Sequence, residues 1–584
     1  MKFKFTIILC LTAILLLFSC SEKTIPDPPV LSDKWITVYD ADAEGISQAW
    51  FETFPEAKYV GSTWDDWQMK NARYRWHKQR FRAGELDSTS CYYLTCNTVA
   101  SPSLIWLNGT LLDQIDHTEI YALDITPYLL ENDYNELVIR NEYLEESFGI
   151  NKLNIEKNIG DTCIIDIKLD YHSMPLYHES PGYTNDLIIY EAFPRHLTGG
   201  NFTAMQNMTS RLNQLGINMV WLMPIHPIGD SQKVGSHGSP YAVRDYFTTN
   251  SRYGSLSQFS SLRSMLHRNN IKLMLDAPIT YSAVDHSWVR DYPTYYQKDD
   301  QDNMIQPPGY KNKDIFAFDM SNSSLIRRME SYLDFWLEQG VDAFRLSGSK
   351  HVDAEVFQEF RDHFTDAEKE PFLLSDGTQA EHLLFGLDAV NGDALYEAFR
   401  DISDGTADAS LIGSTLAEEI RAYPEGSKIL HYAENHETPR AMRSMGVDDH
   451  HLALFTIFSA PGIPMIYCGE ELNNPPKLSL SGKTDVNWYN IHWPTYNLIS
   501  KLSKFRKESP ILSHGDLHQI ADTKAIGGFS RRYRNETWFV LMNYSNTEQS
   551  YQIDVKTTVF SDGVSGVVQN GRVKLKAKGY CIVK

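Results

Sequence analysis

Residues 187–223 read LIIYEAFPRHLTGGNFTAMQNMTSRLNQLGINMVWLM. The runs 187–190 and 217–223 are apolar almost throughout, which is typical of strands buried on both faces. Between them, apolar residues recur at helical spacing, and Gly216 is placed to end that helix. These apolar positions are Phe202, Met205, Met208, Leu212 and Leu215. The stretch therefore predicts a strand, a helix and a second strand.

The same alternation continues along the chain. Further apolar runs that predict buried strands are 271–275, 343–346, 372–374 and 465–467. Strands and helices that alternate over about 300 residues predict a parallel (β/α)₈ TIM barrel, which we assign to residues 186–508. Beyond it only strands are predicted, at 537–541, 551–555 and 573–575, so residues 509–584 are expected to form a C-terminal β-sandwich.

The region before the barrel has a different pattern of predicted elements. Residues 104–107 (LIWL) run into Asn108-Gly109, a strong hairpin signal, and residues 136–140 read as another strand. Strands without intervening helices imply an antiparallel sandwich. Residues 33–175 are therefore predicted to be an N-terminal β-sandwich, which makes the chain a multi-domain protein.

The first twenty residues look like a targeting segment. Lys2 and Lys4 precede an apolar run over residues 5–18, which has the length of a signal-peptide core. The run ends in Leu-Phe-Ser-Cys20, which resembles the lipobox of bacterial lipoproteins, and residues 21–32 form a Pro-rich tether. We expect a bacterial lipoprotein anchored through Cys20 on the periplasmic or cell-surface side of a membrane.

Composition excludes several classes of function. The 54 Lys and Arg against 75 Asp and Glu give a net charge of −21, which argues against a nucleic-acid partner. The seven cysteines are scattered, and no Cys or His spacing suggests a metal site. Cys91 and Cys96 differ by five positions, so on one strand they would face opposite sides and could not bridge.

Seven blocks of the barrel region carry a family resemblance. They are LGINMVWLMPIHPIG (215–229), GSPYAVRDYFTTNSRYGSLSQF (238–259), IKLMLDAPITYSAVDHSWV (271–289), GVDAFRLSGSKHVD (340–353), PFLLSDG (371–377), HYAENHETPR (431–440) and APGIPMIYCGEE (460–471). In this order and spacing the chain resembles the α-amylase family, glycoside hydrolase family thirteen. Residues 33–175 resemble the galactose-binding-like jelly roll of other glycosidases.

The resemblance breaks at the catalytic positions. A retaining glycosidase needs a carboxylate nucleophile and a carboxylic acid, and the family supplies Asp, Glu and a third, stabilising Asp. Here these positions hold Ser347 for the nucleophile, Asp376 for the acid/base and Glu437 for the stabiliser. Serine is a poor nucleophile without a base, and carboxylates displaced by about 1 Å can lose ~10²-fold in rate. The sequence predicts impaired hydrolysis.

Other family positions are kept or altered. The resemblance places Arg345, Asp276, His436 and Tyr241 around the sugar ring, although Arg345 and Asp276 also suit a buried ion pair. Thr280 and Tyr281 replace the family's Asn and His, and because that Asn binds calcium in many relatives, we expect no cofactor and regard a calcium site as doubtful. The acidic run 299–303 lacks the Gly and distal Glu of a calcium loop and reads as a solvated turn.

Three hypotheses follow. The first is a lipoprotein that binds α-glucan oligosaccharides or polysaccharides without cutting them, with outer-membrane glycan-uptake components among its expected partners. The second is an altered, inverting hydrolase that uses Asp376 or Glu437. The third is a partner-docking scaffold with no glycan role. An open, aromatic-lined cleft would favour the first hypothesis, and a mouth plugged by side chains such as Tyr281 would favour the third.

Overall fold

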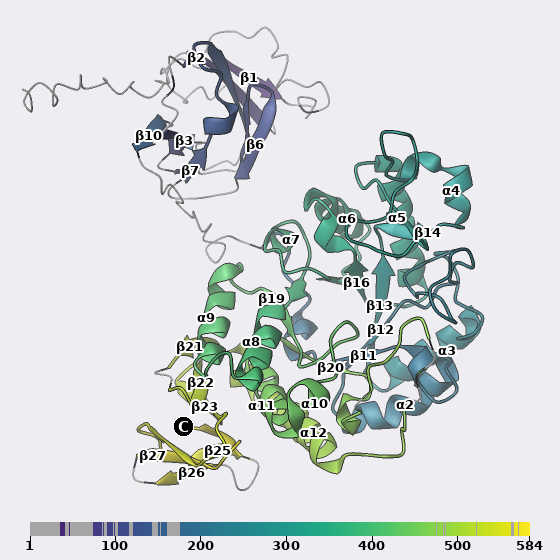
Figure 1. Ribbon diagram of the computed structural model, residues 1–584, viewed down its shortest axis with the longest axis vertical. Coiled ribbons are helices and arrows are strands. Elements are labelled where there is room, and N and C mark those ends of the chain that lie inside the picture. The colour runs from purple at the N-terminus through teal and green to yellow at the C-terminus, as the bar shows by residue number, and fades with distance from the viewer. Residues whose placement is uncertain are drawn as a thin grey trace, which may run out of the picture. The chain divides into compact units, whose positions relative to one another are not determined.

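The structure of the chain is a computed structural model (Figure 1). It describes residues 36–40, 46, 74–83, 86, 90–96, 98–99, 103–115, 121–142, 150–151, 154–159, 176–474, 476–482, 484, 486–520, 523–561, 566–569 and 571–584. The predicted signal segment, Cys20 and the tether lie outside these residues. The chain divides into two compact units, Met1–Leu169 and Asp170–Lys584.

Two antiparallel sheets form the first unit. One has the strand order β1-β2-β8-β5-β6 and the other β10-β3-β7, with a short β4-β9 pair beside them. The strands are β1 (Ile36–Asp40), β2 (Tyr74–Arg82), β3 (Ser90–Cys96), β4 (Thr98–Val99), β5 (Ser103–Leu107), β6 (Thr110–Ile115), β7 (Tyr121–Asp124), β8 (Tyr134–Glu142), β9 (Ile150–Asn151) and β10 (Asn154–Ile159). Both sheets contribute to one core, through Leu94 and Ile155 from one and Ile105 and Ile139 from the other. The predicted sandwich is confirmed.

The predicted hairpin of this unit is also confirmed. It joins β5 to β6 through Asn108 and Gly109, which have φ of 52° and 81°. Positive φ at both central residues is the backbone of a tight hairpin turn, and Asn and Gly tolerate it best. Cys91 and Cys96 lie on one strand, β3, as expected.

Eight parallel strands close into a barrel in the second unit, in the order β11-β12-β13-β16-β17-β18-β19-β20. They are β11 (Ile189–Ala192), β12 (Met219–Leu222), β13 (Lys272–Pro278), β16 (Ala343–Ser347), β17 (Phe372–Ser375), β18 (Ala389–Asn391), β19 (Lys428–His431) and β20 (Ile463–Tyr467). The predicted TIM barrel is confirmed, and six of its strands coincide with predicted apolar runs. Sequence reasoning did not assign β18 and β19 as strands.

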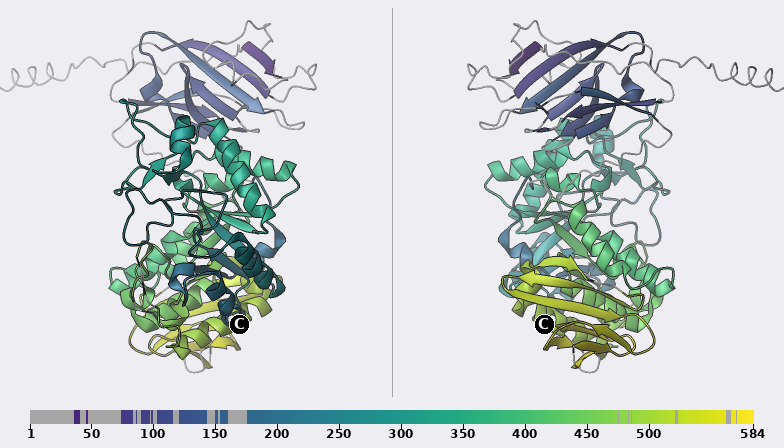
Figure 2. Two further views of the ribbon diagram at one scale, coloured as in Figure 1. Left: turned by 90° about the vertical axis from the view of Figure 1, so that its right-hand side faces the viewer. Right: turned by 90° about the vertical axis from the view of Figure 1, so that its left-hand side faces the viewer.

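Helices surround the barrel (Figure 2). They are α2 (Phe202–Gln214), α3 (Leu256–Arg268), α4 (Ser287–Asp291), α5 (Ser323–Glu338), α6 (Glu355–Asp366), α7 (Glu381–Leu384), α8 (Asp393–Asp404), α9 (Leu411–Ala422), α10 (Ala441–Ser444), α11 (Gly446–Ser459), α12 (Trp493–Glu508) and α13 (Pro510–His514). Between β13 and α5 the chain makes an excursion that contains the antiparallel pair of β14 (Tyr281–Ala283) and β15 (Ile315–Ala317).

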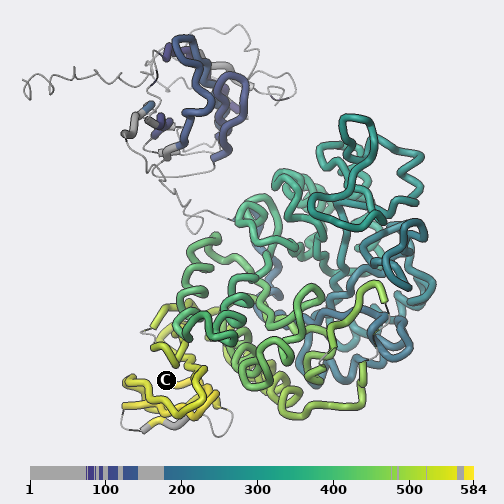
Figure 3. Tube along the Cα trace, viewed as in Figure 1, coloured from purple at the N-terminus to yellow at the C-terminus, as the bar shows by residue number. Residues whose placement is uncertain are grey.

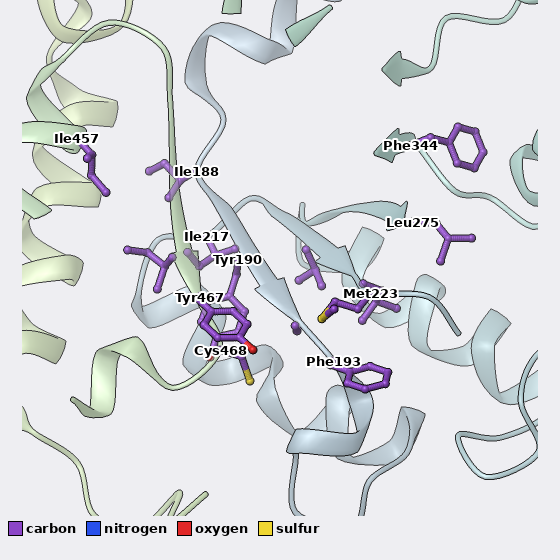
Figure 4. Close-up of a cluster of buried hydrophobic side chains, with 14 of the residues drawn as sticks. Ile188, Tyr190, Phe193, Ile217, Met223, Leu275, Phe344, Ile457, Tyr467 and Cys468 are labelled. Carbon is purple, nitrogen blue, oxygen red and sulfur yellow. The ribbon is translucent and has the colours of Figure 1, made fainter. Parts of the chain in front are cut away.

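Side-chain alternation along the barrel strands separates two cores. Ile188 and Tyr190 join the cluster between strands and helices, together with Ile217, Leu275 and Phe344 (Figure 4). The residues that alternate with these along the strands form a second cluster, in the barrel interior. This cluster includes Ile189, Met219, Trp221, Met274, Ala343, Phe372 and Leu374. Because successive residues of a strand face opposite sides, Glu191, Asp276, Arg345, Ser347 and Asp376 continue the interior rows.

The chain ends in two further antiparallel sheets, ordered β21-β22-β23-β28-β25 and β24-β27-β26. Their strands are β21 (Asp516–Gln519), β22 (Ile526–Tyr533), β23 (Glu536–Asn543), β24 (Gln549–Gln552), β25 (Thr558–Ser561), β26 (Gly566–Gln569), β27 (Arg572–Leu575) and β28 (Tyr580–Val583). The predicted strand 551–555 is too long, because the chain turns after Gln552 and the Val555 amide donates to the Ile553 carbonyl at 3.1 Å. Within the described residues, no helix is both long and apolar enough to cross a bilayer.

Two buried carboxyl groups follow β19 and β20. Burial raises the pKa of Glu434 to about 7 and that of Glu470 to about 8, against the opposing charge of Arg440. The native state therefore holds protons that the unfolded chain loses near pH 4.5, and stability falls as the pH rises through the native pKa values.

Burial lowers the pKa of four histidines to about 4, which makes stability fall as the pH drops below 6.5. These are His196, His226, His286 and His382.

These opposing shifts predict a stability maximum near pH 6.5. Thermal or urea unfolding at several pH values should show a net loss of roughly 1 kcal/mol between pH 6.5 and 8, since one pKa unit corresponds to ~1.4 kcal/mol and the histidines offset part of the carboxyl effect. Glu470→Gln should flatten this alkaline limb, because the amide resembles the protonated carboxyl. Glu425→Gln, at an exposed position, is the control. An alkaline limb of the same slope in Glu470→Gln would contradict the assignment.

Candidate functional site

The predicted sugar-binding residues meet at the carboxyl ends of the barrel strands. Asp276, in β13, accepts hydrogen bonds from Arg345 Nη1 at 3.1 Å, from the Tyr241 hydroxyl at 3.2 Å and from Trp221 Nε1 at 3.3 Å. The Arg345 guanidinium also lies 5.0 Å from the Trp221 ring centroid. Asp276 is fully buried and Arg345 is 4% exposed. The cluster is thus a buried ion pair held between aromatic groups.

His436 joins this cluster from the loop after β19. Its Nδ1 lies 2.5 Å from Glu191 Oε1, and its Nε2 lies 3.0 Å from the Tyr241 hydroxyl. Burial disfavours a charged imidazole here, but the Glu191 carboxylate outweighs it and raises the pKa of His436. Four residues predicted from separate parts of the chain, Tyr241, Asp276, Arg345 and His436, therefore form one network.

Ser347 lies at the end of β16 and contacts the side chain of Tyr281. Its Oγ is 2.7 Å from the Tyr281 hydroxyl, and the residue is 3% exposed. Burial raises the pKa of the Tyr281 phenol far above its usual range, so the phenol stays protonated and cannot act as a base. A serine without a base is not activated for nucleophilic attack.

Asp376, which is predicted at the acid/base position, is hydrogen-bonded by the turn that follows β16. Its Oδ2 accepts the Gly348 amide at 2.7 Å, and its Oδ1 accepts the Ser349 hydroxyl at 2.7 Å and the Lys350 amide at 3.1 Å. Burial favours the neutral acid, but the Arg345 charge 3.8 Å away and these donors together hold the pKa of Asp376 below its ordinary value. A carboxylate held ionised in this way has no proton to give to a leaving oxygen.

Glu437, at the stabiliser position, is largely outside the network. Its side chain is 66% exposed, and its Oε1 lies 3.7 Å from His436 Nε2. The three residues predicted at the family's catalytic positions are therefore a serine covered by Tyr281, a hydrogen-bonded carboxylate and a solvent-exposed carboxylate.

A cavity of about 310 Å³ opens beside this network, on the side of β17, β18 and β19. Trp221, Tyr396 and Tyr432 supply its aromatic walls. Its charged lining consists of Arg345, Lys350, Asp376, Asp393, Glu397 and Glu437. Ser347, Tyr241 and Tyr281 are not part of the lining, so the cavity is displaced from the covered serine.

Sequence reasoning missed most residues of this cavity, among them three on α8. Asp393 accepts the Tyr432 hydroxyl at 2.6 Å, and Tyr396 stacks on Tyr432 with ring centroids 5.5 Å apart. Burial raises the pKa of Asp393, and the Glu437 charge adds to the shift. Asp393, Tyr396 and Glu397 share one face of α8 at spacings of three and four, a pattern that is visible in the sequence.

The residues present do not suit the calcium ion found in many relatives. Thr280 replaces the ligand Asn, and its hydroxyl faces the Gly348 backbone so closely that a Cβ on that glycine would lie 1.8 Å from Thr280 Oγ1. No group of three or more His, Cys, Asp or Glu in the described part of the chain is arranged to hold a metal. The run 299–303 is an exposed turn in which Asp299 Oδ1 accepts the Asn303 amide at 2.8 Å.

A closed parallel barrel with buried carboxylates at the carboxyl ends of its strands defines the class of (β/α)₈ enzymes and their relatives. Residues 191–321 match the family model "Alpha amylase, catalytic domain". This part of the barrel therefore matches the α-amylase family.

Individual relatives are distant. The chain is 23% identical over 392 residues to "Alpha-amylase MalA" of Haloarcula japonica, covering 63% of this chain and 57% of that protein. It is 26% identical to the "4-alpha-glucanotransferase" of Thermotoga maritima, covering 56% of this chain and 85% of that protein. The solved structure of the maltogenic α-amylase AmyB from Thermotoga neapolitana superposes with a TM-score of 0.62 at 25% identity, covering 68% of this chain and 98% of that one. The chain thus spans little more than half of MalA.

Proposed function

We propose that this protein binds α-glucan oligosaccharides at the barrel mouth and is impaired in hydrolysing them. The environment of Asp376 carries the proposal. Its three donors and the Arg345 charge favour the ionised carboxylate, whereas retaining and inverting glycosidases both need a protonated acid. The covered Ser347 supports the same conclusion, since it offers no carboxylate for a covalent intermediate.

Glucan binding is supported by the cavity and by the relatives. Aromatic walls with a few fixed polar groups are common in ligand pockets, and the cavity volume of about 310 Å³ lies at the lower end of their range. The relatives named above are an α-amylase and a 4-α-glucanotransferase. An α-glucan is therefore the ligand we assign to this chain.

An altered hydrolase is the second candidate. Asp393 and Glu437 line the same cavity, and burial raises the pKa of Asp393, as a general acid requires. In this reading Asp393 would protonate the leaving oxygen and Glu437 would activate water. The position of Tyr281 over Ser347 favours the docking-scaffold hypothesis. The open aromatic cavity beside Ser347 argues against that hypothesis.

A matched binding and hydrolysis assay tests the proposal. Calorimetric titration of the whole protein with maltoheptaose should show binding without release of reducing sugar. Tyr396→Ala should weaken binding by roughly three- to tenfold, because it removes an aromatic wall. Tyr292→Ala, an exposed tyrosine outside the cavity, should leave binding unchanged. No binding at all would favour the docking scaffold, and turnover abolished by Asp393→Asn would favour the altered hydrolase.

We also propose a lipid anchor at Cys20, with the protein on the periplasmic or cell-surface side and glycan-uptake components of the outer membrane as partners. The lipobox-like Leu-Phe-Ser-Cys20 sequence and the Pro-rich tether support it. The full chain should partition into membrane and detergent fractions, and Cys20→Ala should release it or block its processing. Cys10→Ala is the matched control. Recovery of the unmodified protein only in the aqueous fraction would count against the anchor.

A further inference from the structure

A second cavity, of about 460 Å³, lies between loops at the carboxyl ends of β11, β12 and β20. Residues 195–200 form one wall, and Thr484, Val486 and Trp488 form another. These segments lie side by side although they are far apart in sequence (Figure 3), and Trp488 Nε1 donates to the His196 carbonyl at 3.1 Å. The cavity shares no lining residue with the first.

Two arginines that have no counter-ion among the described residues, Arg195 and Arg252, line this cavity. Among the described residues, Arg195 donates only to neutral oxygens, those of Gly238 at 3.3 Å, Leu480 at 2.5 Å and Tyr253 at 2.9 Å. Neither Arg195 nor Arg252 forms a salt bridge with any described residue, and no carboxylate is among the described residues that line the cavity. In a chain of net charge −21, two guanidinium groups that line one cavity and form no ion pair with a described residue favour an anion.

His196, which lines this cavity, carries a buried hydrogen-bond acceptor. His196 is 2% exposed, and its Nε2 lies 2.9 Å from the Ser479 carbonyl, so Nε2 carries the proton. Its Nδ1 is left as an acceptor without a partner among the described residues. The charged groups that act on this ring, Arg195, Arg440 and His436, are all cationic and together with burial keep it neutral. An unpaired buried acceptor is costly, and a ligand hydroxyl would satisfy it.

We propose that this cavity binds a sugar phosphate. Arg195 and Arg252 would hold the phosphate, His196 Nδ1 would accept a sugar hydroxyl, and the Trp488 and Tyr253 rings would flank the sugar. The cavity volume of about 460 Å³ is within the range of small-molecule pockets. Because the two cavities have separate linings, this site does not depend on glucan binding at the first cavity.

Titration of the full-length protein with glucose 6-phosphate tests the proposal, with glucose and inorganic phosphate as parallel probes. Glucose 6-phosphate should bind, more weakly at high salt, and at least about tenfold more tightly than either parallel probe. Arg252→Ala should weaken this binding about tenfold or more, since it removes a charge-assisted contact. Arg244→Ala removes an exposed arginine that pairs with Asp230 outside the cavity and should have no effect.

His196→Gln separates the hydroxyl contact from the phosphate contact. Glutamine can still donate to the Ser479 carbonyl but places no acceptor at Nδ1, so affinity for glucose 6-phosphate should fall while affinity for inorganic phosphate stays constant. Maltoheptaose binding should be unchanged in both cavity variants. Failure of glucose 6-phosphate to bind, equal affinity for glucose or phosphate alone, or an equal loss in Arg244→Ala would overturn the proposal.

Discussion

The wild-type protein is expected to release no more than trace reducing sugar from starch, maltooligosaccharides or pullulan. Ser347 cannot form the glycosyl ester of a retaining mechanism, and Asp376 is held ionised by Gly348, Ser349 and Lys350. Loss of a nucleophile together with its acid partner lowers turnover by roughly 10⁴–10⁶-fold. Reducing-sugar release over a day at high enzyme concentration, with an active α-amylase as the positive control, measures this.

Reversion variants show which part of the site is limiting. Ser347→Asp alone should restore little, because Asp376 still lacks a proton to donate. Ser347→Asp with Asp376→Glu and Glu437→Asp should restore some turnover if the barrel still presents a glucan site. The Tyr281 hydroxyl, 2.7 Å from Ser347 Oγ, would cap the new carboxylate, so adding Tyr281→His should increase the recovery. Robust wild-type turnover that Asp376→Asn abolishes would contradict this reading.

The barrel was predictable because its interior and its helix-facing side both exclude water. Six strands are apolar runs that need no tertiary information to recognise. The two missed strands are short and carry polar residues that only tertiary contacts explain. In β19, Lys428 bonds Asn185 Oδ1 at 2.7 Å and His431 Nε2 bonds Glu419 Oε2 at 2.9 Å. A local sequence pattern does not predict contacts between residues that are this far apart in the chain.

The candidate site was predictable in its positions but not in its contacts. Family resemblance places Ser347, Asp376 and Glu437 at strand ends, since strand order fixes where those residues emerge. The donors that bind Asp376 come from the turn after another strand, and the hydroxyl over Ser347 comes from the excursion after β13. Such distances depend on loop conformation, which composition and periodicity do not encode. Asp393 was missed although its spacing on α8 is visible in the sequence, because its partner Tyr432 lies 39 residues further along the chain.

Arg345→Met is expected to lower the free energy of unfolding by about 3–5 kcal/mol, because it leaves buried carboxylates without their cation. Arg345 is 4% exposed and pairs with Asp276 at 3.1 Å and with Asp376 at 3.8 Å. Urea unfolding followed by tryptophan fluorescence measures the change. The matched control is Arg244→Met, whose exposed pair with Asp230 should contribute at most about 1 kcal/mol.

A second change separates the structural role of Arg345 from a sugar-binding role. Asp276→Asn removes the closer uncompensated charge, so the double variant with Arg345→Met should regain part of the lost stability. If the only role of Arg345 is its ion pair, the double variant should regain maltoheptaose affinity along with stability, because the fold around the cavity recovers. If its guanidinium instead binds the glucan, stability should return while affinity stays low, since Arg345 lines the cavity itself. A loss below 1 kcal/mol in Arg345→Met would mean that the ion pair does not stabilise the barrel.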